Sequence, residues 1–203
     1  ANILNQWLDN NNDGKPDNDL VINALIKNNA TLIMGQSEDD LEFFFENLID
    51  VLEKENIDID NFESTLLGLI SSEPNIAYLE EILHLVTQVG YANAYPEVFG
   101  EFKGSSISKA MDIARGGYFE TVPEIYPKSS WYHYYDKSCD YACMITEYFY
   151  WSLTSLLGAQ INRFDEIAEE WELNTPNKMT KDKLIMDLLQ DKKYQLPTRL
   201  PSF

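Results

Sequence analysis

The sequence has few basic residues for its length. Lys and Arg number 15 against 34 Asp and Glu, which gives a formal net charge of −19 at pH 7. A surface this negative repels phosphate groups, so we expect neither nucleic acid nor an anionic membrane surface among the partners. No apolar run reaches the roughly 20 residues that a transmembrane helix needs, so no membrane-spanning segment is predicted.

Cysteine is also scarce. Cys139 and Cys143 are the two cysteines of the chain, and they are four positions apart. One cysteine pair does not make a structural zinc site, which takes four Cys or His ligands. The pair can form a local disulfide at the start of a helix or remain a pair of thiols, and the sequence leaves both open.

Several catalytic signatures are missing. There is no glycine-rich loop to hold phosphates and no Gly-x-Ser-x-Gly elbow for a serine nucleophile. A ferritin-like di-iron centre needs two Glu-x-x-His motifs, whereas this chain has one, Glu81-x-x-His84. Those three classes of function are therefore excluded.

The hydrophobic pattern is mostly helical. Its period predicts a mainly α fold, a single globular helical domain of ordinary size for 203 residues. We expect a helix–loop–helix hairpin over 1–30 and a helical domain over 31–203. Pro123, Pro127 and many aromatic residues interrupt the period over 118–137, which predicts a long ordered loop. Within the domain we expect, among others, helices at about 61–71, 74–91, 139–158 and 160–172.

Oxygen-bearing side chains alternate near the start of the chain. Six positions of the loop over residues 9–20 carry the pattern: Asp9, Asn11, Asp13, Gly14, Lys15 and Asp17. This spacing resembles the calcium loop of EF-hand and dockerin proteins, in which the glycine makes the turn and the residue after it binds through its carbonyl. The resemblance implies Ca²⁺ held by Asp9, Asn11, Asp13, Lys15 and Asp17.

The twelfth position departs from the EF-hand pattern, because Leu20 stands where a bidentate Glu closes the site. A single loop of this kind favours a structural calcium over a calcium switch. The alternative interpretation is an Asn/Asp/Gly turn between two helices, since these residues favour turns.

The second candidate site is on the helix expected from Pro74. Glu80, Glu81 and His84 project from one side of it, and both carboxylates are within one turn of the imidazole. The segment 80–84 resembles the His-Glu-x-x-His helix of zincin metallopeptidases. That resemblance implies Glu81 as the catalytic base and His84 as a metal ligand, with Glu80 in place of the first His. The alternative is a solvated helix face.

Glu147 is the third member of this site. Apolar residues surround it in nearly every direction of the 139–158 helix, which predicts a central, buried helix. A buried carboxylate needs a partner. That partner is either His84 with Glu80, around Zn²⁺ or another divalent transition metal, or it is tyrosine hydroxyls or a guanidinium such as Arg115 or Arg163. His133 is a further candidate ligand, or a half-buried loop histidine.

These features predict a secreted calcium-binding protein with a second divalent-metal site in a zincin-like domain, either an active or a degenerate metallopeptidase. The alternative is a non-enzymatic extracellular protein that binds a ligand, protein or peptide partner in an aromatic-lined cleft, with calcium purely structural. We expect secretion or a periplasmic location, because the chain opens at Ala1 as a processed protein does and Asn29-Ala30-Thr31 fits a glycosylation acceptor.

Overall fold

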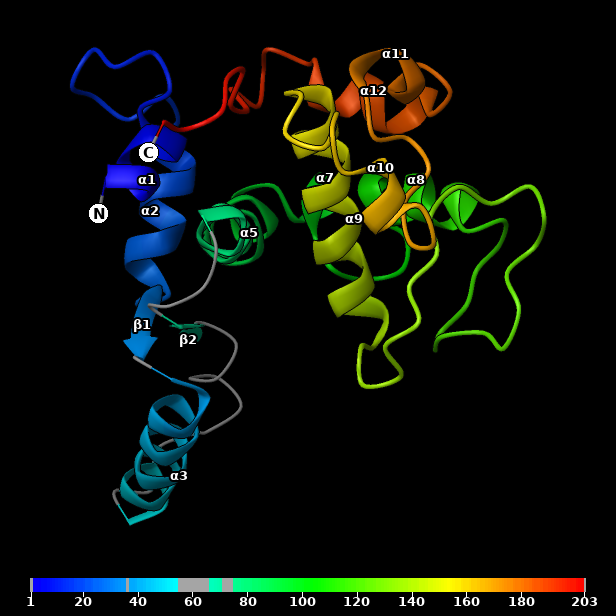
Figure 1. Cartoon of the computed structure of the whole chain (residues 1–203). Coiled ribbons are helices and arrows are strands. Elements are labelled where there is room, and N and C mark those ends of the chain that lie inside the picture. Colours follow the sequence, from blue (N-terminus) through cyan, green and yellow to red (C-terminus); the bar gives the residue numbers. More distant parts are fainter. Residues whose placement is uncertain (1, 36, 55–65, 71–74, 203) are drawn as a thin grey trace.

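The computed structural model describes residues 2–35, 37–54, 66–70 and 75–202. These residues form a mainly α fold, which confirms the prediction (Figure 1). The elements, in chain order, are α1 (Asn2–Leu8), α2 (Asp19–Lys27), β1 (Thr31–Gly35), α3 (Glu38–Lys54), β2 (Leu66–Ile70), α5 (Asn75–His84), the π-helix η1 (Leu85–Tyr91), α6 (Ala92–Ala94), α7 (Pro96–Phe99), α8 (Ser106–Ala114), α9 (Tyr141–Leu156), α10 (Phe164–Ile167), α11 (Pro176–Met179) and α12 (Lys183–Leu189).

Helix α9 is the centre of the core. Eleven of its residues are buried, from Met144 to Ser155. The surrounding elements place Phe99 and Trp171 against it, and the rings of Phe99 and Phe149 stack 5.2 Å apart. The all-round apolar pattern of this segment therefore predicted its buried position correctly.

The N-terminal hairpin packs on η1. Figure 1 shows α5 between α2 and α9, and α2 makes its main helix contact with the π-helix that continues α5. Gly90 permits this approach, because a Cβ there would lie 2.8 Å from Val21 Cγ1. Trp7, Val21 and Leu25 of the hairpin belong to the same hydrophobic cluster as the α9 residues.

The structure differs from the sequence prediction at β2. The expected helix over 61–71 is wrong at Leu66–Ile70, which pairs in parallel with β1 in the register Thr31↔Leu66; residues 61–65 and 71 lie outside the described part. A short continuous apolar run fits a strand as well as a helix, so periodicity alone does not separate them. The crossover through α3 is what makes parallel pairing with β1 possible.

The expected helix over 160–172 is also wrong for most of its length. Only α10 (Phe164–Ile167) is α-helical there, and Trp171 instead forms an antiparallel bridge with Tyr132. This bridge ties the 118–137 segment to the core. That segment contains no helix, as predicted. Among the residues described, no helix is both long enough and apolar enough to cross a membrane.

The C-terminal tail lies against the 9–20 loop, and Asn10 holds the two together. Its Nδ2 donates to the carbonyls of Gln6 (3.2 Å) and Arg199 (2.8 Å). Its Oδ1 accepts from the backbone N–H of Thr198 (2.9 Å) and of Arg199 (3.2 Å). Asn10 is itself buried, and the four bonds are part-buried.

Replacing Asn10 with alanine should therefore destabilise the protein. Asn10→Ala leaves several part-buried backbone groups without partners, which should lower the free energy of unfolding by about 1–3 kcal/mol in urea denaturation. Asn23→Ala is the control, because Asn23 is exposed on α2 and its loss should change stability by less than about 0.5 kcal/mol. Equal effects of the two substitutions would contradict the role of Asn10.

Candidate metal centre

The junction between α5 and η1 positions His84. His84 is the last residue of α5, and the π-helix begins at the next position. Thr87 supports this junction by donating its hydroxyl to the carbonyls of Leu83 (3.1 Å) and His84 (3.3 Å). Short π-helical turns within helices are frequent at functional sites.

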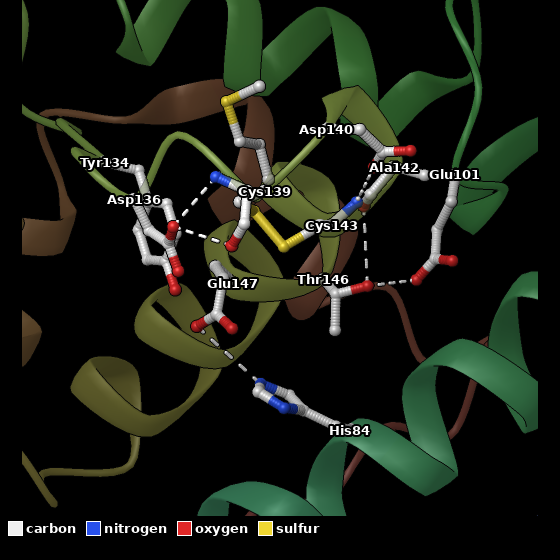
Figure 2. Close-up of a disulfide and its surroundings, with 12 residues drawn as sticks. His84, Glu101, Tyr134, Asp136, Cys139, Asp140, Ala142, Cys143, Thr146 and Glu147 are labelled. Carbon is white, nitrogen blue, oxygen red and sulfur yellow. Dashed lines mark hydrogen bonds and ion pairs between the residues drawn. A yellow bond between two sulfur atoms is a disulfide. The ribbon is translucent and has the colours of Figure 1, made fainter. Parts of the chain in front are cut away.

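His84 faces Glu147 across the contact between α5 and α9. Its Nε2 lies 3.8 Å from Glu147 Oε2, and the two side chains are 8% and 14% exposed (Figure 2). The Tyr150 ring stands edge-on to the imidazole at 5.6 Å and fixes its orientation. The tertiary structure thus brings together two residues that are 63 positions apart, which is one of the two arrangements that the sequence left open for Glu147.

Glu80 completes the group. Glu80, His84 and Glu147 each offer one ligand atom, and these atoms all lie within 4.8 Å of one another. No other group of three His, Cys, Asp or Glu ligand atoms this close is found among the described residues. Ligand atoms around one tetrahedral ion, with bonds of about 2.0–2.2 Å, are roughly 3.4 Å apart, so the side chains must draw together by up to about 1.4 Å to hold it.

Burial disfavours the charged forms of both His84 and Glu147. Burial lowers the pKa of His84 to about 4, which favours the neutral imidazole. Burial, followed by the charges of Glu80 and Glu81 and then of Glu170 and Asp136, raises the pKa of Glu147 well above its usual range. The His84–Glu147 contact is therefore not a pair of opposite charges, although its length would suit one, because burial disfavours both charged forms.

His84 Nε2 is also without a hydrogen-bond partner, although it is buried. Buried polar atoms in proteins are nearly always satisfied, and an exception calls for an explanation. A cation between the three ligand atoms would satisfy this nitrogen. It would also replace the proton that burial keeps on Glu147. The residues present therefore fit a divalent metal ion.

The other partners considered for Glu147 form no hydrogen bond or ion pair with it among the described residues. Arg115 donates through Nη1 to the Phe119 carbonyl (2.9 Å), while its Nε and Nη2 have no hydrogen-bond partner, and Arg163 forms an ion pair with Glu166. The buried hydroxyl of Tyr132 donates to the Met144 carbonyl (2.8 Å). His84 is the basic residue that forms an ion-pair-length contact with Glu147 in the described part of the chain.

Sequence reasoning did not single out Tyr134, Asp136 or Glu170, which lie near this group. His133 donates its backbone N–H to the Glu170 carbonyl (2.7 Å), which brings Glu170 beside the segment that carries Tyr134 and Asp136. The His133 side chain itself packs against the Tyr126 ring at 5.2 Å and is half-buried. It is not part of the Glu80, His84 and Glu147 group. No pattern in the sequence linked Glu170 to the aromatic segment, because the bridge between Tyr132 and Trp171 is a tertiary contact.

The 9–20 loop folds around its own polar side chains. Both carboxylate oxygens of buried Asp9 accept backbone N–H groups, from Asp13 and from Gly14, at 3.0 Å. Gly14 has φ +84°, the left-handed turn that the pattern predicts for this position. Lys15 donates its N–H to Asp13 Oδ1 (2.9 Å).

Asp17 closes the loop from the other side. Its Oδ2 accepts from the Asn10 N–H (2.6 Å), and its Oδ1 accepts from the Asn11 amide (2.8 Å). Leu20 is more than half exposed in the first turn of α2. It contributes no ligand at the closing position. Asp9, Asp13 and Asp17 do not form a second close group of ligand atoms.

The cysteines form a disulfide between Cys139 and Cys143 at the start of α9 (Figure 2). Asp140 caps this helix by accepting the Cys143 N–H at 2.8 Å. The disulfide decides between the two states that the sequence left open for the cysteines.

Comparison with protein-family models, with curated proteins and with solved structures gives no match for this chain.

Glu101 is a second buried carboxyl that sequence reasoning missed. It lies between α7 and α8, and Thr146 of α9 donates its hydroxyl to it (Figure 2). Burial raises the pKa of Glu101 to about 7; the Thr146 hydrogen bond opposes this rise, and the charge of Asp140 adds to it.

The folded protein should therefore lose stability as the pH rises from 4.5 to about 7, because the unfolded chain releases this proton first. Glu101→Gln removes the titration and keeps an acceptor for Thr146. It should stabilise the protein by about 1–3 kcal/mol near pH 8 and have little effect near pH 4, measured by urea unfolding. Glu97→Gln, at an exposed position of α7, is the control. The same effect of Glu101→Gln at both pH values would contradict this account.

Proposed function

We propose that this protein binds a divalent transition metal ion at Glu80, His84 and Glu147, in a secreted or periplasmic helical domain that calcium stabilises. The observation that carries the proposal is the approach of three ligand atoms within 4.8 Å, one of them a buried nitrogen without a hydrogen-bond partner. A cation explains both the missing partner and the buried carboxyl.

The donor set favours Zn²⁺ or a similar ion. Imidazole suits zinc and other first-row transition metals, and carboxylates complete such sites. The two carboxylates, Glu80 and Glu147, balance the two charges of the ion. Three protein ligands leave one position of a tetrahedral site for water or substrate, as in catalytic rather than structural zinc sites.

In the hydrolytic form of this proposal, Glu81 is the general base. It lies between the two α5 ligands, at the position of the general base in the zincin helix that the segment resembles. In that form Glu81 accepts the proton of a water molecule as the water attacks a peptide carbonyl. The metal, when bound, supplies the positive charge that makes this water acidic. The degenerate form binds metal and peptide without hydrolysis, because Glu80 replaces the first histidine.

The calcium and the location belong to the same proposal. Asp9, Asn11, Asp13, the Lys15 carbonyl and Asp17 hold one structural Ca²⁺. The buried position of Asp9 and the turn at Gly14 support this role. The Cys139–Cys143 disulfide supports secretion or a periplasmic location, because disulfides persist in oxidising compartments.

Metal content tests the proposal directly. Elemental analysis of protein dialysed against zinc and calcium should find about one of each ion per chain, and a mild chelator should remove them. Glu147→Gln should abolish zinc retention, a loss larger than the roughly 10- to 100-fold that an outer-shell partner costs. Glu120→Gln, at an exposed position, is the control.

Asp13→Asn should lower the calcium content and leave zinc in place. Calcium without zinc in the parent protein would overturn the second site. Zinc that is retained in full by Glu147→Gln would show that the ion binds elsewhere.

Hydrolysis is tested with an unstructured protein substrate and the zinc-loaded protein. If the centre is hydrolytic, Glu81→Gln should reduce the rate by about 10²- to 10⁴-fold and keep the zinc, because the general base is lost while the ligands remain. The parent protein with bound zinc and no activity would reject hydrolysis and leave the degenerate, peptide-binding form.

A cavity of about 560 Å³ favours non-enzymatic ligand binding as a second candidate function. It lies between the 9–20 loop, the end of α9 and the C-terminal tail, and includes Asn11, Asp17, Leu157 and Leu196. Its volume is in the range of small-molecule sites. In this second candidate function the ligand binds in this cavity and not at the aromatic 118–137 segment, where Tyr132 is fully buried.

A further inference from the structure

Arg115 is a buried cation at the end of α8. It is the C-cap residue of that helix, and it is fully buried. Its guanidinium carbon lies 5.3 Å from the centroid of the Phe119 ring and 5.7 Å from that of the Tyr126 ring. Both rings belong to the 118–137 segment, so the Arg115 side chain joins this segment to α8.

The guanidinium group uses one of its three nitrogen atoms in a hydrogen bond. Nη1 donates to the Phe119 carbonyl (2.9 Å), whereas Nε and Nη2 are buried and have no hydrogen-bond partner among the residues that the structure describes. These two nitrogens form one edge of the planar group, and their N–H bonds point the same way, as a fork. Such a fork binds an anion through two charge-assisted hydrogen bonds.

No carboxylate forms an ion pair with Arg115 within the described ranges. Burial raises the pKa of Asp112, one turn earlier in α8, and the hydrogen bond from Tyr141 and the charge of Arg115 oppose this rise. Asp112 therefore interacts with Arg115 through charge alone, while its Oδ1 accepts the Tyr141 hydroxyl at 3.0 Å. The buried cation has no anionic group of the described chain in contact with it.

The backbone closes over this end of α8. The Ser130 hydroxyl donates to the Arg115 carbonyl (2.8 Å), and the Trp131 N–H donates to the Ala114 carbonyl (2.9 Å). Gly116 permits the close approach, because it has φ +79° and a Cβ there would lie 2.9 Å from Pro127 Cβ. Whatever binds the free edge of Arg115 must therefore be small.

A water molecule would satisfy the two N–H groups, but it would leave the positive charge uncompensated. A guanidinium group stays protonated in proteins, so burial cannot neutralise it as it neutralises a histidine. A buried charge without a counter-charge is strongly destabilising, and an anion in contact with it removes much of that cost. We propose that Arg115 binds one chloride-sized anion between Nε and Nη2, beneath the start of the 118–137 segment.

Anomalous diffraction from crystals of the full chain soaked in bromide tests the position of the anion. A bromide peak should lie within hydrogen-bonding contact of both Nε and Nη2 of Arg115. A water molecule or a protein oxygen in that place would overturn the proposal. A peak that needs molar bromide, without any stabilisation by chloride in solution, would mark an adventitious ion only and would also overturn it.

Thermal unfolding tests the site in solution. Replacing gluconate, which is too large for the closed site, with about 0.1 M chloride at constant ionic strength should raise the Tm by about 2–4 °C, because the anion binds the folded protein alone. Arg115→Met keeps the length of the side chain and removes its charge, so it should abolish this rise. Arg199→Met, at an exposed position, is the matched control and should keep the full rise.

The same Tm of the parent protein in both salts, or an equal chloride effect in Arg115→Met and Arg199→Met, would overturn the anion site. Arg115→Lys keeps the charge and loses the fork, so its chloride effect should be smaller than that of the parent. This second variant and the two measurements on the parent decide the question even where Arg115→Met does not fold.

Discussion

The contact between α5 and α9 determines the candidate site, because it buries a carboxyl against an imidazole. Glu147 projects from a helix that is apolar on almost every side, and His84 projects from the last turn of α5 toward it. Burial disfavours the charged form of each group, and Glu80 adds a like charge. The buried His84 nitrogen has no hydrogen-bond partner, and this is the observation from which the metal site is proposed.

The rest of the fold holds these two helices in place. Gly90 lets α2 approach η1 closely, and η1 continues directly from His84. The bridge between Tyr132 and Trp171 holds the aromatic segment beside the segment that carries Glu170, and the Tyr132 hydroxyl donates to the Met144 carbonyl of α9. Asn10 ties the N-terminal loop to the C-terminal tail. The Glu80, His84 and Glu147 group and the 9–20 loop are thus both attached to one hydrophobic core.

Some of this was predictable because it follows from local sequence. Helical spacing placed Glu80 and His84 on one side of their helix, and the apolar residues around Glu147 identified it as a buried carboxylate. Two helix predictions were wrong, at Leu66–Ile70 and over most of 160–172. In both, the segment pairs with a distant one, through β1 or Tyr132, and periodicity does not report such pairing. Glu101, Asp136 and Glu170 were missed for the same reason.

The sequence by itself determined the mainly α class, the buried character of α9 and the turn at Gly14, because each depends on side-chain periodicity or on local backbone preference. Only the tertiary structure decided that Glu147 meets His84 rather than Arg115 or Arg163, and that the cysteines are joined. These depend on which helices pack together. That choice is made by the fit of whole surfaces, such as Val21 over Gly90, and not by any one segment.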